Sequence, residues 1–237
     1  MAYQTIFKRY ELKYLLTDEQ KQTVLDAMSP YMLLDKYGRT TIRNLYYDTD
    51  TYRLIRRSIE KPAYKEKLRI RSYIRATHDS TVFVELKKKY KHVVYKRRVS
   101  LPEAEAMAWL GGERHCGLNT QISREIDYFM HFYGTLTPTV FLTYEREAYY
   151  ALDGSDFRVT FDENILCRRD DLSLTSEVGG IPLMEQGRTL MEIKCASGMP
   201  LWLAHTLSAQ HIYKTSFSKY GTAYQTMILC KGAYLHA

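Results

Sequence analysis

Apolar and polar residues alternate along most of this chain, and this alternation predicts β-strands. In residues 67–73, which read KLRIRSY, Leu68 and Ile70 lie on one face of such a strand. The other face carries three cations, Lys67, Arg69 and Arg71. The same period of two recurs at residues 5–14, 40–47, 64–73, 81–88, 91–100, 138–149, 156–167 and 189–195. We therefore expect about eight strands.

A repeat of three to four residues predicts helices between some of these strands. Helical patterns cover residues 17–29, 102–110, 119–133 and 200–213, with a further short helix within 47–58. Thr17 is the expected N-cap of the first helix. Because strands and helices do not alternate as βαβ units, the pattern predicts an α+β fold on an antiparallel sheet, and eight such strands can close into a barrel. No repeat or long linker divides the chain, so residues 1–237 are expected to form a single domain.

Net charge and cysteine content limit which classes of binding partner and which cellular compartment to expect. A net charge of +7 favours a polyanionic partner, such as nucleic acid, an anionic membrane or a phosphate-rich small molecule. The four cysteines (Cys116, Cys167, Cys195 and Cys230) lack metal-binding spacing and fit a reducing cytoplasm. The sequence shows no secretory signal and no run long enough to span a membrane. We therefore expect a cytoplasmic chain without a transmembrane segment.

Polar and mainly charged residues recur at every second position on most predicted strands. They are Arg9, Glu11, Lys13, Arg69, Arg71, Glu85, Lys87, Lys96, Arg98, Tyr144, Arg146, Arg158, Thr160, Asp162, Glu192 and Lys194. On any single strand this is typical of a solvent-facing surface. The opposite faces are apolar, and the predicted helices carry residues able to cover them: Leu25, Met28, Ile126, Met130, Leu201 and Leu203. If the helices pack outside, the cations line the interior, where they must hold an anion.

The cations are accompanied by three carboxylates, Glu11, Glu85 and Glu192. These carboxylates indicate what kind of anion the interior binds. They would repel a nucleic-acid backbone, so we expect no nucleic-acid partner. With Mg²⁺ or Mn²⁺ they would instead form a metal–phosphate site, in which Arg and Lys bind the phosphate oxygens. The chain contains neither G-x-x-x-x-G-K-[ST] nor G-x-G-x-x-G, so neither loop is available to hold the phosphates. The residues therefore point to a metal-chelated polyphosphate.

A series of motifs resembles a known family. RYELKY, LYYDT, LRIRSY, FVELKKK, YKRRVSL, TYEREAY, FRVTFDENI, LMEIK and SFSKYG occur in this order. Over about residues 5–225, the series resembles the catalytic domain of the vacuolar transporter chaperone (VTC) polyphosphate polymerases, in the CYTH-like or triphosphate tunnel metalloenzyme superfamily. The resemblance implies a closed eight-stranded antiparallel β-barrel, called a triphosphate tunnel, with helices packed outside. It also implies a polymerase that transfers the γ-phosphate of ATP to a growing polyphosphate chain.

The resemblance assigns roles to the residues that match the family motifs. Arg69, Arg71 and Lys219 would be catalytic. The substrate would be bound by Lys13, Lys87, Lys96, Tyr144, Arg146, Arg158 and Ser218. Glu192 would hold the divalent metal, Mn²⁺ or Mg²⁺. The membrane-anchoring segments of eukaryotic members have no counterpart here, so transport of the product across a membrane would need a partner protein.

Two departures from related sequences bear on the activity. Ser216 stands where some eukaryotic members have a basic residue, which would weaken affinity or change the preferred chain length. Hydrolytic triphosphatases of the superfamily carry E-x-E-x-K on the first strand, whereas this chain has Arg9 in place of the first glutamate. The change favours transfer to another phosphate over hydrolysis. A triphosphatase of the same fold and a non-catalytic polyphosphate-binding sensor remain the alternatives.

Overall fold

The computed structural model describes residues 6–91, 93–196 and 198–229, with side chains described from residue 10. Its strands are β1 (Ile6–Thr17), β2 (Met32–Leu34), β3 (Thr40–Asp48), β4 (Tyr64–Ser72), β5 (Thr81–Tyr90), β6 (Val93–Pro102), β7 (Thr137–Ala151), β8 (Arg158–Arg168), β9 (Ile181–Pro182) and β10 (Arg188–Cys195). Its helices are α1 (Asp18–Met28), α2 (Arg53–Ile59), α3 (Glu103–Leu110), α4 (Gln121–Tyr133), α5 (Leu201–Ala209) and α6 (Lys219–Tyr224), followed by a π-helical turn (Gln225–Leu229). The α+β class and the large antiparallel sheet are as the sequence predicts.

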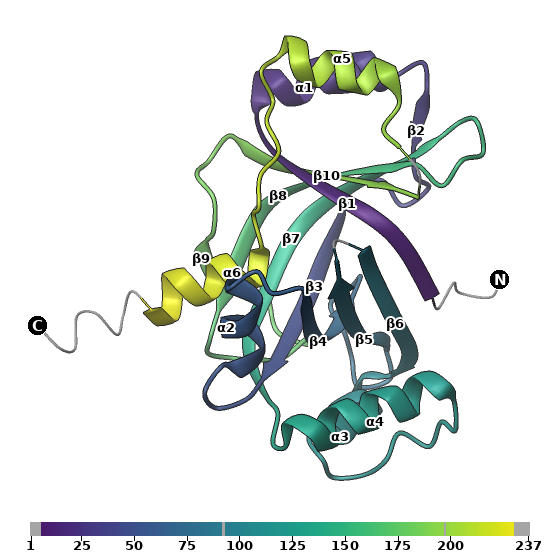
Figure 1. The fold of residues 1–237 in the computed structure, drawn as a ribbon. Helices are drawn as coiled ribbons and strands as arrows, with labels where there is room; N and C mark the ends of the chain where they lie inside the picture. The colour runs from purple at the N-terminus through teal and green to yellow at the C-terminus, as the bar shows by residue number, and fades with distance from the viewer. Residues whose placement is uncertain (1–5, 92, 197, 230–237) are drawn as a thin grey trace, which may run out of the picture.

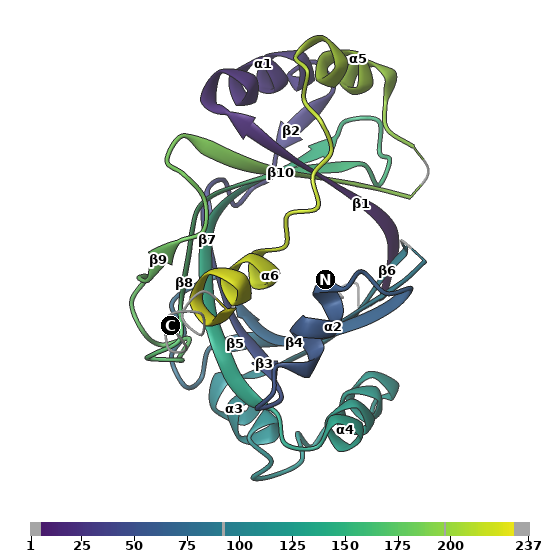
Figure 2. The same ribbon diagram turned by 60° about the vertical axis from the view of Figure 1, so that its left-hand side comes forward.

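The sheet pairs strands that are far apart in the chain. Its ten strands follow the order β2-β7-β3-β4-β5-β6-β1-β10-β8-β9, and β7 also pairs with β8. Followed from β7 through β3 and onward to β8, the pairings therefore return to β7. The strands curve around one another in Figure 2, and α6 lies inside this curve.

Helices cover the outer apolar faces of the strands in two layers (Figure 1). At one end, α1 and α5 pack together, and Met28 and Leu203 join a core with Phe161 of β8. At the other end, α3 and α4 cover β4, β5 and β6, where Ile126 joins the core. Leu201 was expected to cover the sheet but is 76% exposed, because it begins α5 on the side that faces solvent.

The predicted elements agree with the structure except at a few ends. Thr17 caps α1 as expected, since its side chain accepts a hydrogen bond from the backbone N–H of Gln20. The helix expected over 200–213 ends at Ala209, because the chain turns through His211, whose φ is +52°. The short helix expected within 47–58 begins only at Arg53, because residues 47 and 48 belong to β3.

A buried carboxylate holds two short helices together. Asp48, at the end of β3, accepts hydrogen bonds from the backbone N–H groups of Leu54 and Ile55 at the start of α2. It also accepts one from the hydroxyl of Tyr220 on α6, at 2.9 Å. The ring of Tyr220 stacks on Tyr46 with the ring centroids 4.6 Å apart. These contacts fix α6 against β3, although its short sequence predicts no helix.

None of the helices in the described part of the chain is both long and apolar enough to cross a membrane. Cys116, Cys167 and Cys195 are free and buried, whereas Cys230 lies outside the described residues. The side chain of Arg9, on which part of the sequence argument rests, also lies outside them.

Candidate active site

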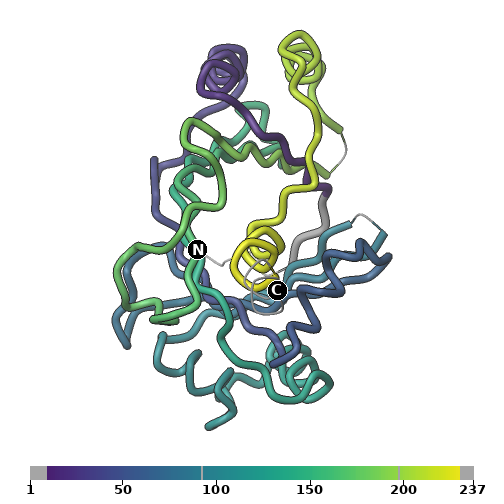
Figure 3. The backbone as a smooth tube through the Cα atoms, turned by 90° about the vertical axis from the view of Figure 1, so that its left-hand side faces the viewer, coloured from purple at the N-terminus to yellow at the C-terminus, as the bar shows by residue number. Residues whose placement is uncertain are grey.

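The inner faces of the strands line a large cavity of about 1740 Å³. Every site residue expected from the sequence lines it or its mouth: Lys13, Arg69, Arg71, Lys87, Lys96, Tyr144, Arg146, Arg158, Glu192, Ser218 and Lys219. They come from β1, β4, β5, β6, β7, β8 and β10 and from the start of α6 with its N-cap. Strand pairing thus brings distant parts of the sequence to one space. Residues of α6 also line the cavity, and Figure 3 shows this helix, in yellow, within the curve of the strands.

Glu85 is the centre of one charged cluster in this interior. Its side chain is fully buried on β5, directly opposite Arg69 of β4 and Arg98 of β6. One carboxylate oxygen accepts two hydrogen bonds from Arg69, at 2.9 and 2.7 Å, and the other accepts two from Arg98, at 2.9 and 2.6 Å. Lys96 lies 3.3 Å away. Burial alone would raise the pKa of Glu85, but the surrounding cations hold this pKa well below its usual value.

Uncharged side chains fix the two arginines of the RIR motif. Arg69 donates to the hydroxyl of Tyr46 at 2.9 Å. Arg71 donates to the amide oxygen of Asn44 at 3.0 Å and to the hydroxyl of Tyr144 at 2.9 Å. Tyr144, expected to bind substrate, therefore also positions Arg71. These bonds hold both guanidinium groups in fixed orientations, as binding of phosphate oxygens requires.

A second charged cluster contains Asp162 and Glu192. Arg146 of β7 binds Asp162 with two hydrogen bonds, at 2.5 and 2.6 Å, and lies 3.4 Å from Glu192. Lys219 of α6 contacts the same two carboxylates. Burial would lower the pKa of Lys219, but Asp162 and Glu192 raise it above its usual value. Lys219 is therefore a permanent cation in the cavity wall.

Glu192, the expected metal ligand, lies among cations. Its carboxylate is 3.2 Å from Lys13, 3.3 Å from Lys219 and 3.8 Å from Lys194. Burial would raise its pKa, but these ammonium groups lower the pKa well below its usual value. Among the described residues, no three acidic, histidine or cysteine side chains gather into a metal-binding group. The protein thus offers individual carboxylate ligands rather than a complete metal cage.

Glu11 is a second carboxylate in the cavity wall. It lies 2.6 Å from Lys87. Burial would raise the pKa of Glu11, but Lys87 and Lys194 outweigh burial and the nearby Glu192, and they lower this pKa to about 2. Glu11 and Glu192 are therefore both ionised at neutral pH. Ionised carboxylate oxygens are the hard ligands that Mg²⁺ and Mn²⁺ prefer, so the donor chemistry fits the expected metal.

The segment before α6 is attached to β1 beside the cavity. The backbone N–H of Thr215 donates to the carbonyl of Lys13 at 2.7 Å, and the Lys13 ammonium donates to the carbonyl of Phe217 at 3.0 Å. Ser218 then caps α6 by accepting the N–H of Gly221 at 3.2 Å. Its oxygen also accepts a hydrogen bond from Lys67 at 3.0 Å. With both acceptor positions used, the Ser218 hydroxyl is left to donate its proton to an anion in the cavity.

Several cavity residues had no site role assigned from the sequence. They are Lys65, Lys67, Lys89, Arg98, Lys194 and Lys214, of which Arg98 and Lys194 were expected on the inner face of their strands. Lys67 shares the alternation of Arg69 and Arg71, so the pattern already pointed to it, but it lies outside the family motif. Ser216, the departure noted in the sequence, also lines the cavity. Arg158 begins β8 and is exposed at the cavity mouth.

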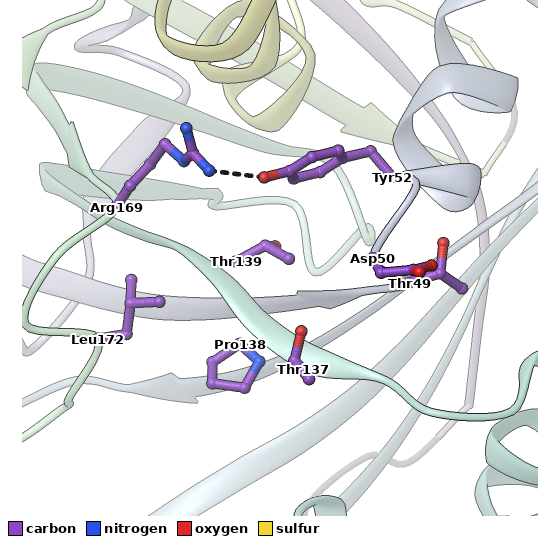
Figure 4. A pocket seen from close by; sticks show the side chains of 8 residues that line it. All are labelled: Thr49, Asp50, Tyr52, Thr137, Pro138, Thr139, Arg169 and Leu172. Carbon is purple, nitrogen blue, oxygen red and sulfur yellow. Dashed lines mark hydrogen bonds between the residues drawn. The ribbon is translucent and has the colours of Figure 1, made fainter.

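A smaller pocket of about 130 Å³ lies between the start of α2 and β7 (Figure 4). Arg169 reaches across it and donates to the hydroxyl of Tyr52 at 2.7 Å. This smaller pocket shares no lining residue with the large cavity. Its wall contains one cation and one carboxylate, Arg169 and Asp50, so it lacks the concentrated charge of the large cavity.

Comparison with solved structures supports the fold. The chain is similar to a putative adenylate cyclase from Bacillus halodurans, with a TM-score of 0.58 and 13% sequence identity over 95% of this chain and 100% of that one. It is also similar to a putative adenylyl cyclase from Hippeastrum that is described as having a dominant triphosphatase activity. That match has a TM-score of 0.54 and 18% identity, and it covers 92% of this chain and 95% of the other. At such identities the likeness shows the fold alone.

Sequence comparison is more specific. No curated protein gives a significant match. The VTC domain family, in contrast, matches residues 8–228, which is most of the 237-residue chain. This match confirms the resemblance seen in the ordered motifs, and the protein therefore belongs to the VTC domain family.

Proposed function

We propose that this protein is an ATP-dependent polyphosphate polymerase that transfers the γ-phosphate of ATP to the end of a polyphosphate chain. The observation that carries the proposal is the convergence of eleven sequence-matched residues on one cavity. Most of these residues are cations, and the arginines among them that face the cavity centre are held by tyrosine and carboxylate partners. Such an interior suits a polyanion that must be held in one orientation.

The arrangement of the eight long strands bears on how the substrate would enter the site. We infer that the eight long strands act as a closed tunnel and that residues 1–237 work as one domain. The pairing of β7 with β8 supports this, because these are the first and the last of the eight long strands in the strand order. A tunnel would limit the access of water to the reacting phosphates and would admit a linear chain from one end, as growth of a polymer requires.

Glu192 and Glu11 are the residues that would hold a divalent metal, Mn²⁺ or Mg²⁺. Both line the cavity and both are ionised. They supply two carboxylates, so phosphate oxygens of the substrate would provide further ligands. When bound, the metal would neutralise negative charge on the phosphates during transfer.

The side chains of this protein would contribute to catalysis by positioning the phosphates and by stabilising their negative charge. Arg69, Arg71 and Lys219 would bind the oxygens of the transferred phosphate and stabilise the charge that spreads during transfer. An oxygen of the acceptor phosphate bonds to the γ-phosphorus, the bond from that phosphorus to the bridging oxygen breaks, and ADP leaves. The acceptor phosphate is already ionised at neutral pH, so the step needs no strong general base.

A triphosphatase of the same fold is the second candidate. It is favoured by the structural similarity to the Hippeastrum protein, for which triphosphatase activity is described. The two candidates share the binding of a triphosphate and differ only in the acceptor, which is phosphate in one case and water in the other. Chain length of the product therefore separates them.

Two substitutions test the assignment of the site. Arg69→Ala removes a cation that would contact the transferred phosphate, and Glu192→Ala removes the proposed metal ligand. We expect each variant to lose about a hundredfold or more in ATP-dependent product formation, as for loss of one electrostatic contact in other enzymes. A matched control is Arg75→Ala, since Arg75 is exposed and pairs with Glu177 on the surface. If Arg69→Ala and Glu192→Ala both retain full activity, the site is wrong.

A further inference from the structure

Arg43 is a buried cation on the outer face of β3, away from the large cavity. Its neighbours Ile42 and Asn44 face the interior, where Ile42 lines the cavity and Asn44 binds Arg71. Because side chains alternate along a strand, Arg43 points to the other face, which also carries Leu45 of the outer core. Arg43 is only 8% exposed. Among the described residues its Nε has no hydrogen-bond acceptor and its guanidinium forms no ion pair.

A second unpaired polar group lies beside this guanidinium. Thr143 of β7 is directly opposite Arg43 in the strand register, so the two side chains share one face of the sheet. Thr143 is 1% exposed, and its hydroxyl has no hydrogen-bond partner in the part of the chain that the structure describes. Buried polar groups are nearly always paired, so two unpaired groups side by side indicate a shared partner from outside the chain.

The charge of Arg43 also requires a partner. Burial lowers the pKa of Arg43, and the opposing effect of Glu177 does not cancel this. An arginine nevertheless keeps its proton at neutral pH, so it cannot become neutral as a buried lysine can. Glu177 does not supply the missing negative charge, because it pairs with Arg75 on the surface and its side chain is 76% exposed. A buried charge of this kind needs a counter-ion.

The loop between β8 and β9 covers this part of the sheet. On one side, Arg168 of β8 donates to the backbone carbonyl of Glu177 at 2.8 Å. On the other side, beyond β4, the backbone N–H of Ala76 donates to the carbonyl of Leu174 at 3.1 Å. Since β3 and β7 lie between β4 and β8 in the sheet, the loop crosses their outer faces. It therefore encloses the face on which Arg43 lies.

The donors at this place select a small oxyanion. A guanidinium offers parallel N–H groups that bind two oxygens of one anion, and the hydroxyl of Thr143 offers a further donor. Neighbouring strands are about 4.8 Å apart, so both side chains can reach a single tetrahedral anion. Because Arg43 is only 8% exposed, the enclosure favours an ion the size of orthophosphate over a polymer.

We propose that Arg43 and Thr143 form a binding site for one tetrahedral oxyanion of the orthophosphate class, on the outer wall of the sheet beneath the β8–β9 loop. The bound ion neutralises Arg43 and holds the loop against β3 and β7. The site lies on the opposite side of the strands from the large cavity, so it does not depend on the proposed function.

Hydrogen exchange of the loop, measured by mass spectrometry, tests this site separately from the cavity. An ion that binds only the closed loop slows its exchange about tenfold at about nine times the dissociation constant. We therefore expect inorganic phosphate to slow exchange in residues 170–179 about tenfold in the wild type and less than about twofold in Arg43→Met. Sodium chloride at equal ionic strength is the control for general salt effects.

Arg169→Met is the matched control variant. It removes the same charge from the same region, but Arg169 reaches away to the hydroxyl of Tyr52. This variant should keep the wild-type response to phosphate, and loss of the response here would overturn the assignment to Arg43. Arg43→Met should fold, because it replaces an unpaired buried charge with an apolar side chain. Its melting temperature without phosphate should equal or exceed that of the wild type.

Three results would overturn the site. If phosphate slows loop exchange in the wild type no more than chloride does, Arg43 binds water and not an oxyanion. Equal slowing in the wild type and in Arg43→Met would place the bound phosphate elsewhere. A lower melting temperature of Arg43→Met in the absence of phosphate would show that the guanidinium already has a partner within the protein.

Discussion

Glu85 shows how single residues set the charge of the interior. One buried carboxylate lies among Arg69, Arg98 and Lys96, so its oxygens are already occupied by cations. The sequence suggested Glu85 as a metal-site carboxylate, but this enclosure makes its role structural. Glu11 and Glu192, in contrast, line the cavity. A buried charge of this kind is valuable mainly because its loss leaves its partners uncompensated.

Glu85→Gln should therefore be strongly destabilising. Removal of the negative charge leaves Arg69 and Arg98 buried without compensation, which costs about 3–5 kcal/mol in the free energy of unfolding. Urea denaturation measures this change. The control is Glu125→Gln, which removes a half-buried partner of Lys88 and Arg97 and should cost no more than about 1 kcal/mol. Equal stability of the two variants would contradict the role assigned to Glu85.

Lys96 should make the stability of the ligand-free protein depend on pH. Burial, together with Arg98, Arg71 and Arg69, outweighs Glu85 and lowers the pKa of Lys96 from 10.5 to about 7. Above pH 7 the unfolded state then binds more protons at this residue than the folded state does. Stability should accordingly increase as pH rises from 7 toward 10.5, and the penalty is fully present below 7.

Denaturation in urea between pH 7 and about 8 tests this sign, below the pKa of about 8.5 at which thiols ionise in the unfolded chain. We expect Lys96→Met to show a smaller rise in unfolding free energy across the window than the wild type. Wild-type stability that falls across this window, or an unchanged slope in Lys96→Met, would show that Lys96 keeps an ordinary pKa.

At the scale of elements, alternation predicted the eight long strands because each has one buried face and one polar face. It missed α6 for an equally physical reason. The six residues KYGTAY include Gly221 and show no helical period. Their helix exists because Tyr220 stacks on Tyr46 and donates to Asp48, contacts that form only in the folded chain. The short strands β2 and β9 were also missed, because three and two residues are too few to show an alternation of apolar and polar positions.

Comparison of two helix N-caps, Ser218 and Thr17, can distinguish the structural role of Ser218 from its proposed role in binding. Ser218 caps α6 beside the cavity, whereas Thr17 caps α1 away from it. We expect Ser218→Ala and Thr17→Ala to lower the free energy of unfolding by about 1 kcal/mol each. Only Ser218→Ala should weaken tripolyphosphate binding, measured by calorimetric titration. Equal tripolyphosphate affinities in the two variants would limit Ser218 to its role as a cap.

For the whole molecule, the excess of cations in the interior couples stability to anion binding. The sequence indicated which residues meet there, because alternation and the family motifs mark the inner face of each strand. It did not indicate that Asp162 and Glu85 bind the arginines, or that Lys65 lies opposite Lys89. These pairings depend on strand register, which is set by the assembled sheet.

Tripolyphosphate should therefore stabilise the protein against heat and denaturant. At one hundred times its dissociation constant, a ligand that binds only the folded state adds about 2.7 kcal/mol to the free energy of unfolding. Sulfate at equal ionic strength is the control for general salt effects. If tripolyphosphate raises the melting temperature no more than sulfate does, the cavity is not a triphosphate site.

Incubation of the purified protein with ATP and Mn²⁺, with products resolved by chain length, tests the central claim most directly. The account predicts ADP together with a ladder of polyphosphates that lengthens with time, absent from Arg69→Ala and Glu192→Ala. Release of orthophosphate with no chain longer than the substrate would contradict the polymerase and identify a triphosphatase.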